Sequence, residues 1–437
     1  MGKRRFVRPF GPRPPMRVAQ APASLGQRLL WLLDHYRGAG GTLNCPLLVR
    51  LYGPLEADAV RTAFGAVVSR HEALRTAFRG RGRRLTQLVE ESGAVALAEV
   101  DLSGHVARED RLQQAIAEEV RTRIDPTDQP VRMTLWRMGE RDHVLCVNMH
   151  HLVTDVWSNI VIFREFSSFL DRPNAGGSVL PAPGWQYRQF AEWQRHAFDR
   201  GELDAHRDYW KRQLAGARFP KLPRRPAGGT LERTAAVEST RIGLATALAL
   251  RRFARSHRTT VFSVMLSVFY VLLHRMTGQT DLAVASLFAN RTRREVQNTV
   301  GFLANMSILR TCLPERAAFQ DVVRATHDTV VDAFTHQALP YQVLEPIQTD
   351  GARAGDVVFQ LVAETVRTNE DTGINAEVLV SERLGSRFDF ELALIPDKNG
   401  FRAFLFYAEH QFEPAFVKEF LLNYVSLAAE LAAGHAT

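Results

Sequence analysis

Residues 142–158 read DHVLCVNMHHLVTDVWS, an alternating apolar run that leads directly into two adjacent histidines. The run 142–149 predicts a strand, and the similar run at 131–139, separated from it by a short charged turn, predicts its hairpin partner. Asp155 stands just before apolar positions at helical spacing. The stretch therefore predicts a strand, a short polar loop and a helix, with the histidines where the strand ends.

The two histidines allow three interpretations: a metal site, a general base or a pair of core side chains. Adjacent side chains on a strand point to opposite faces, so His150 and His151 would not both reach one ion. The spacing is not HExxH and no third His or Cys cluster is in view, which disfavours a metal site. A histidine titrates near pH 6.5 and can serve as a general base. Asp155 could cap the helix or bind an arginine, and two core histidines with a capping aspartate remain an equal alternative.

Length, composition and charge narrow the class of protein. A chain of 437 residues that is 46% hydrophobic suggests two domains. No apolar stretch is long enough to span a bilayer, and the basic lead-in at 1–20 lacks the apolar region of a signal peptide.

Three distant cysteines without a CxxC pair suggest reduced thiols and a cytoplasmic location. Arginines are spread among acidic residues and no nucleic-acid motif is present, which disfavours a nucleic-acid partner. The net charge of +8 would equally suit an acidic protein partner, and charge alone does not decide the partner.

Proline, glycine and charge at 217–235 interrupt the helical pattern and predict a linker between an N-terminal lobe, 21–216, and a C-terminal lobe, 236–437. Both halves mix strands with helices, which predicts layered α/β domains. Helices are expected at 24–36, 56–74, 108–124, after the histidines, 185–216, 244–257, 260–277, 316–334 and 413–433. Further strands are expected at 45–53, 236–244, 281–289, 305–311, 357–364, 376–381, 388–395 and 401–408.

The stretch MHHLVTDVWS resembles the HHxxxDG motif of the condensation domains of nonribosomal peptide synthetases, whose fold is shared with chloramphenicol acetyltransferase. Other stretches resemble further motifs of that family in the same order, and the likeness covers 24–435. The resemblance implies two chloramphenicol-acetyltransferase-like lobes in a V-shaped pseudo-dimer, with the active site at their interface. The stretches are SLGQRLLWLL (24–33), RHEALRTAF (70–78), YRQFAEWQ (187–194), VGFLANMSILR (300–310) and HQALPYQ (336–342).

The resemblance also implies an activity: transfer of an acyl or aminoacyl group from a carrier-protein thioester to an amine or hydroxyl. The substrates would ride on the phosphopantetheine of peptidyl or acyl carrier proteins, with a small-molecule acceptor and no intrinsic cofactor, metal, nucleic acid or membrane. His151 is expected to be catalytic, and Asp155 to be buried against Arg70 or Arg75. The other residues expected to support the site are His150, Asn305 and Ser158.

The sequence departs from the family pattern at Val156, where glycine is usual. It also lacks a clear match to the seventh motif of that family, for which DGARAGDVVFQ (350–360) is the only candidate. A β-branched residue would be strained if that position required a positive φ, and otherwise would add bulk beside the histidine. Because the chain starts with Met1, a free-standing enzyme is expected. The alternatives are an acyltransferase that uses acyl-coenzyme A, and an inactive module that recruits other enzymes.

Overall fold

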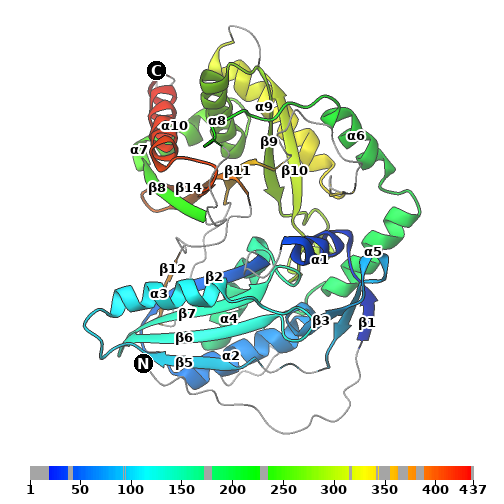
Figure 1. Ribbon diagram of the computed structural model, residues 1–437, viewed down its shortest axis with the longest axis vertical. Coiled ribbons are helices and arrows are strands. Elements are labelled where there is room, and N and C mark those ends of the chain that lie inside the picture. The colour runs from blue at the N-terminus through cyan, green and yellow to red at the C-terminus, as the bar shows by residue number, and fades with distance from the viewer. Residues whose placement is uncertain are drawn as a thin grey trace. The chain divides into compact units, whose positions relative to one another are not determined.

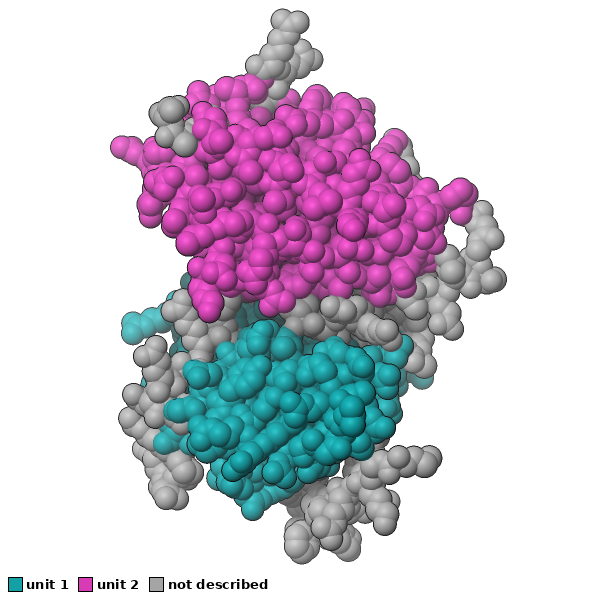
Figure 2. All heavy atoms as spheres, turned by 90° about the vertical axis from the view of Figure 1, so that its left-hand side faces the viewer, with its two compact units in different colours: residues 1–201, 291–303, 366–384 teal, residues 202–290, 304–365, 385–437 magenta. Residues whose placement is uncertain are grey.

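The computed structural model describes residues 19–37, 43–91, 93, 95–171, 180–226, 235–313, 317–340, 343, 355–362, 373–379 and 388–434 (Figure 1). The chain divides into two compact units, coloured separately in Figure 2. Unit 1 comprises residues 1–201, 291–303 and 366–384, and unit 2 comprises residues 202–290, 304–365 and 385–437. The first boundary therefore precedes the linker expected at 217–235, and two later segments return to unit 1.

Unit 1 is built on a five-stranded sheet with the strand order β12-β2-β7-β6-β5. Neighbouring strands are antiparallel except for β5 and β6, which are parallel. The edge strand β12 comes from the second half of the sequence, which is one reason why the unit is not a continuous piece of chain. The strands are β2 (Asn44–Tyr52), β5 (Leu97–Asp101), β6 (Val131–Gly139), β7 (Asp142–His150) and β12 (Asn375–Val378).

Both faces of this sheet are covered by helices, which explains why β7 is buried at every position after Asp142. Leu145 and Val147 pack in one buried cluster with side chains of α2 and α4. Val144 and Cys146 pack in a second cluster with side chains of α3. The alternation continues to the end of the strand, so His150 falls on the α3 face. The helices are α2 (Ala57–Arg70), α3 (Arg108–Arg121) and α4 (Val156–Asp171).

A small antiparallel sheet, in the order β1-β4-β3, completes the described part of unit 1 together with α1 and α5. Helix α1 starts with a reciprocal cap: the Gln27 amide N–H donates to Ser24 Oγ and the Ser24 amide N–H donates to Gln27 Oε1, both at 3.0 Å. The elements are β1 (Ala19–Pro22), β3 (Thr76–Arg79), β4 (Thr86–Val89), α1 (Leu25–Arg37) and α5 (Tyr187–Asp199).

Unit 2 contains a six-stranded mixed sheet with the order β10-β9-β11-β13-β14-β8. The inner pairs β9–β11 and β11–β13 are parallel and the other neighbours are antiparallel. The strands are β8 (Ala235–Gly243), β9 (Asp281–Phe288), β10 (Asn305–Cys312), β11 (Val357–Leu361), β13 (Phe390–Asp397) and β14 (Gly400–Ala408).

The core of unit 2 forms between this sheet and its helices. Two fully buried tyrosines illustrate how it accommodates polar atoms: Tyr270 Oη donates to the Leu309 carbonyl at 2.7 Å, and Tyr424 Oη donates to the Met265 carbonyl at 3.0 Å. Each hydroxyl is therefore satisfied by backbone, as a buried donor must be. The helices are α6 (Asp204–Leu214), α7 (Leu244–Ser256), α8 (Val261–Thr277), α9 (Phe319–Thr335) and α10 (Pro414–Gly434).

The expected α/β layering is confirmed, and the helical stretch 185–216 is found to be two helices. The chain breaks between α5 and α6 at Gly201, whose φ of +75° does not continue a helix. Cys45 and Cys146 are buried, Cys312 is exposed, and none of the three forms a disulfide. Among the described helices, no single one is long and apolar enough to cross a membrane, although α7 and α8 meet the criterion as a pair bent by 109°.

Candidate active site

The two histidines lie at the end of β7 and make different contacts. His150 is buried, and its Nδ1 accepts a hydrogen bond from the Leu152 amide at 3.2 Å, which assigns the ring proton to Nε2. That Nε2 lies 3.9 Å from Asp34 Oδ1. Burial would raise the pKa of Asp34, but His150 and Arg123 together hold it below its ordinary value. His150 thus lies beside the ion pair that Asp34 forms with Arg123.

His151 is held on a different neighbour. Its Nδ1 lies 2.7 Å from the carbonyl oxygen of Thr154, and because a carbonyl can only accept, Nδ1 must donate. In the neutral imidazole this places the lone pair on Nε2. The main-chain N–H of His151 donates to the Leu43 carbonyl at 2.8 Å, and the side chain is 7% exposed. The loop therefore fixes both the tautomer and the position of an imidazole that can accept a proton.

Asp155 holds this loop from the other end. It is buried, precedes the first residue of α4, and accepts the Ser158 amide N–H at 2.7 Å, which caps the helix. Arg291 binds both carboxylate oxygens, at 2.9 and 3.0 Å, and the Leu303 amide donates to Oδ2 at 3.0 Å. Burial would raise the pKa of Asp155, but Arg291 and Ser158 outweigh it and keep that pKa below its ordinary value. The carboxylate is ionised at neutral pH and serves as an anchor.

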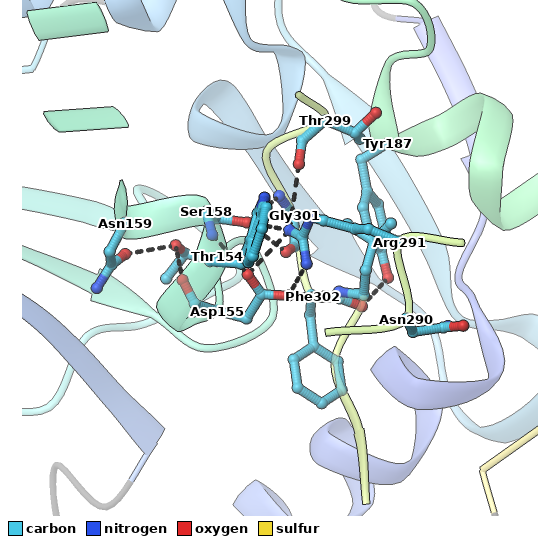
Figure 3. A network of polar contacts seen from close by, with 12 residues as sticks. Thr154, Asp155, Ser158, Asn159, Tyr187, Asn290, Arg291, Thr299, Gly301 and Phe302 are labelled. Carbon is cyan, nitrogen blue, oxygen red and sulfur yellow. Dashed lines mark hydrogen bonds and ion pairs between the residues drawn. The ribbon is translucent and has the colours of Figure 1, made fainter. Parts of the chain in front are cut away.

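Ser158 adds hydrogen bonds between the start of α4 and residues 291–303. Its hydroxyl donates to the Gly301 carbonyl at 2.8 Å and accepts from the Gly301 amide at 3.1 Å and from Arg291 at 2.8 Å. Arg291 also reaches the Thr299 carbonyl, at 3.3 Å. Figure 3 shows these side chains converging between the start of α4 and this segment. Polar contacts thus join the loop after His151 to a segment far away in the sequence.

The prediction that Asp155 pairs with Arg70 or Arg75 is wrong, because the arginine that binds Asp155 is Arg291. Arg70 instead donates to Glu165 Oε2 at 2.8 Å and to the Leu180 carbonyl, and Arg75 donates to the Glu90 carbonyl. Both arginines belong to the segment at the end of α2, where they bind these other acceptors instead of Asp155.

The remaining expected residues divide between the two units. His150, His151, Asp155 and Ser158 come together on the loop in unit 1, as their sequence proximity requires. Asn305 begins β10 in unit 2, where its Nδ2 donates to the Gln337 carbonyl at 2.7 Å.

Val156 does not have the strained backbone that a β-branched residue would have at a positive φ. It is the first residue of α4 and is not among the described non-glycine residues with a positive φ. Its side chain is 54% exposed. The departure from the family glycine therefore changes side-chain bulk next to Asp155 and leaves the fold of the loop intact.

Several residues of the site were not identified from the sequence. Arg291 follows a predicted strand among other arginines, and nothing local separates it from Arg293 and Arg294. The partner of His151 is a backbone carbonyl, which any residue at position 154 would supply. Gly301 could have been noticed as a glycine in a matched motif. A Cβ at this position would lie 1.9 Å from Cδ2 of Tyr187, so the backbone passes directly over that ring.

Comparisons with known proteins identify the family. The family model for the condensation domain matches residues 19–436. The chain is 30% identical over 404 residues to a linear gramicidin synthase of Brevibacillus parabrevis, covering 89% of this chain and 5% of that protein. It is 30% identical over 441 residues to phosphinothricin tripeptide synthetase PhsC of Streptomyces viridochromogenes, covering 97% and 40%. The chain therefore spans well under half the length of these relatives.

A solved structure is similar over almost all of both chains. SgcC5 of Streptomyces globisporus, in complex with (R)-(-)-1-(2-naphthyl)-1,2-ethanediol and sucrose, is 26% identical with a TM-score of 0.78, covering 94% of this chain and 98% of that one. The family match over nearly every residue, the relatives and this structure lead to one conclusion: the chain belongs to the condensation-domain family of the nonribosomal peptide synthetases.

Proposed function

We propose that this protein transfers an acyl or aminoacyl group from a carrier-protein thioester to an amine or hydroxyl acceptor, with His151 as the general base. The observation that carries the proposal is the 2.7 Å contact between His151 Nδ1 and the Thr154 carbonyl. That bond presents Nε2 as the basic nitrogen, which is free of the proton that Nδ1 carries and can take one from an acceptor group.

The proposed reaction needs one proton acceptor. The acceptor amine or hydroxyl attacks the thioester carbonyl carbon while His151 Nε2 takes its proton, and a tetrahedral adduct forms. The adduct collapses as the carbon–sulfur bond breaks, and the proton is delivered to the leaving thiolate. An α-amine has a pKa of about 7.7–8.0 and is partly neutral already, whereas a hydroxyl depends much more on the base. The loss caused by removing His151 should therefore be larger for an alcohol than for an amine.

Asp155 and Arg291 support this chemistry without taking part in proton transfer. Their bidentate pair is buried, and its carboxylate remains ionised across the working pH range because its pKa is lowered. In the proposal the pair keeps residues 151–155 in the conformation that brings the Thr154 carbonyl to His151. Catalytic groups that neighbouring residues hold rigidly reach the reactive geometry at a smaller entropic cost.

The proposed partners are carrier proteins that bear the thioester on phosphopantetheine. The net charge of +8 is compatible with association with acidic surfaces. The salt dependence of carrier-protein binding would test this contribution. The solved relative SgcC5 holds an aryl diol. That observation supports including alcohols, and vicinal diols in particular, among the acceptors to be tried here.

The test is intact-mass spectrometry of carrier proteins loaded with acetyl, hexanoyl or aminoacyl groups and incubated with the protein and a panel of amines and alcohols. We expect acyl loss from the carrier, matched by a new amide or ester, with the wild type. His151→Ala should reduce that rate by about a hundredfold or more. His105→Ala, a half-buried loop histidine, is the matched control and should retain the wild-type rate.

Two outcomes would replace the proposal. If acyl-coenzyme A donors react as readily as loaded carriers, the protein is an acyl-coenzyme A-dependent transferase of the same superfamily. If wild type and His151→Ala leave every carrier and every coenzyme A donor unchanged, the protein is a non-catalytic recruitment module.

A further inference from the structure

Phe302 is an aromatic side chain that contacts His151 directly. The two ring centroids are 4.9 Å apart, with an interplanar angle of 65°, which is an edge-to-face arrangement. Phe302 also lies against the start of α1, because a Cβ at Gly26 would be 2.9 Å from its Cε1. Its ring therefore lies close both to Gly26 and to the imidazole of His151.

The backbone of Phe302 is held by Tyr187, the first residue of α5. Tyr187 Oη donates to the Phe302 carbonyl at 2.7 Å and, since its own hydrogen is used there, accepts from Ser24 Oγ at 2.8 Å. Burial raises the pKa of Tyr187, so its hydroxyl remains a donor at every working pH. The ring of Tyr187 also lies under Gly301 with no room for a Cβ. Figure 3 shows Tyr187 beside Gly301 and Phe302.

We propose that Tyr187 is a positioning residue for His151, acting through Phe302. The inference rests on the proposed role of His151 as the base. The hydrogen bond from Nδ1 to Thr154 fixes one edge of the imidazole, but the terminal torsion of a histidine is broad, so the ring plane needs a second contact. Phe302 supplies that contact, and Tyr187 fixes where Phe302 can lie.

A purely structural role for Tyr187 is the competing explanation, and unit 2 provides the matched control for it. Tyr270 is also fully buried, and its hydroxyl donates to a backbone carbonyl at the same 2.7 Å, yet it lies in the core of the other unit. Removal of either hydroxyl leaves one carbonyl without its donor and also breaks a contact with one hydroxyl side chain, Ser24 beside Tyr187 and Thr311 beside Tyr270. The two Tyr→Phe variants therefore carry the same chemical defect, and only one of them lies beside Phe302. Ser24→Ala would be a poorer test because that hydroxyl also caps α1.

The experiment compares Tyr187→Phe with Tyr270→Phe in the full chain. Histidine is isotopically labelled, and long-range proton–nitrogen correlation spectra report the ring tautomer, with the His151 signals assigned by their loss in His151→Gln. We expect the wild type and Tyr270→Phe to show one set of His151 signals with the proton on Nδ1. Tyr187→Phe should shift or broaden these signals and lower kcat for acyl transfer by about tenfold with little change in KM.

The inference is overturned if Tyr187→Phe gives the same His151 signals and the same kcat as Tyr270→Phe. Should Tyr187→Phe not fold, Phe302→Leu tests the same contact, because it keeps an apolar side chain and removes the aromatic ring. The spectra need no substrate, so the positioning claim is decided separately from catalysis. An inactive wild type with the expected spectral change would refute the proposed function and leave the contact established.

Discussion

Two buried carboxylates are both paired with arginine, one directly before the first residue of helix α4 and one in the middle of that helix. Asp155 binds Arg291, the Ser158 amide and the Leu303 amide. Glu165 binds Arg70 and His71, each at 2.8 Å, at the end of α2. Burial would raise the pKa of both, and their partners hold both below the ordinary values. The chemistry is the same, but the first pair holds the loop that bears His151 and the second joins two helices.

The difference teaches that a buried ion pair does not reveal its role by chemistry alone. Its role depends on what its partners are attached to. Arg291 and Leu303 begin and end a segment that sequence distance separates from α4, so the Asp155 pair determines how that segment meets the loop. Arg70 is the last residue of α2, a helix that already packs on α4 through apolar side chains, and His71 follows it directly. The Glu165 pair therefore adds to an interface that exists without it.

The largest expected effect comes from removing each carboxylate. Asp155→Ala leaves Arg291 buried without its main partner and should lower the free energy of unfolding by about 3–5 kcal/mol. Glu165→Ala should cost less, about 2 kcal/mol, because Arg70 keeps the Leu180 carbonyl as an acceptor. Urea unfolding of both variants checks the order, and a greater loss for Glu165→Ala would contradict it.

The next largest effect is expected at Gly301, in the segment that also carries Arg291. Gly301→Ala places a methyl group 1.9 Å from the Tyr187 ring, and overpacking of this kind should cost about 3 kcal/mol. Gly65→Ala is the matched control, since its Cβ would meet nothing within 4 Å and it lies inside α2. That substitution should stabilise the protein by about 0.5–1 kcal/mol. Thermal unfolding of the pair decides, and equal shifts would refute the close packing at Gly301.

A pH series separates the ionised anchor from simple packing. The folded-state pKa of Asp155 lies below its ordinary value, so its stabilisation is present above about pH 3.9 and is lost as the pH falls through the folded pKa. Asp155→Asn removes this titration. Below about pH 4 the stability of the wild type should fall more steeply than that of Asp155→Asn, by up to about 1.4 kcal/mol per pH unit. Parallel pH dependences would show that the carboxylate does not titrate with folding.

The smallest effect concerns Val156. Because this residue is helical and exposed, Val156→Gly should change the free energy of unfolding by no more than about 0.5 kcal/mol. A stabilisation well beyond that value would mean that valine is strained at this position. Calorimetric unfolding of the variant beside wild type is sufficient.

Regular patterns make most of the fold predictable from the sequence. The run 142–149 predicts a strand because apolar residues fill its centre, at 144–147, and the spacing of apolar residues predicts the long helices. The short strands β1, β3 and β4 are not predictable in this way, since four residues are too few to establish a period. The split between α5 and α6 also escapes the pattern, because a single glycine determines it.

The site is predictable only where its residues are consecutive. His150, His151 and Asp155 share one loop, so their proximity follows from the sequence itself. Arg291 is brought to Asp155 by the fold over a separation of 136 residues, and arginine is too common in this chain for its type alone to single it out. The Thr154 carbonyl could not be predicted because a backbone acceptor carries no sequence signature.

The most direct test of the account compares the turnover of Asp155→Asn and Glu165→Gln on acyl-loaded carrier protein, under conditions in which both variants are fully folded. Each substitution keeps the shape of its side chain and removes one buried negative charge. We predict that Asp155→Asn loses about a hundredfold in kcat, because the loop no longer holds His151, while Glu165→Gln stays within about twofold of wild type. Equal losses in the two variants would contradict the claim that the Asp155–Arg291 pair belongs to the active site and the Glu165 pair to the core.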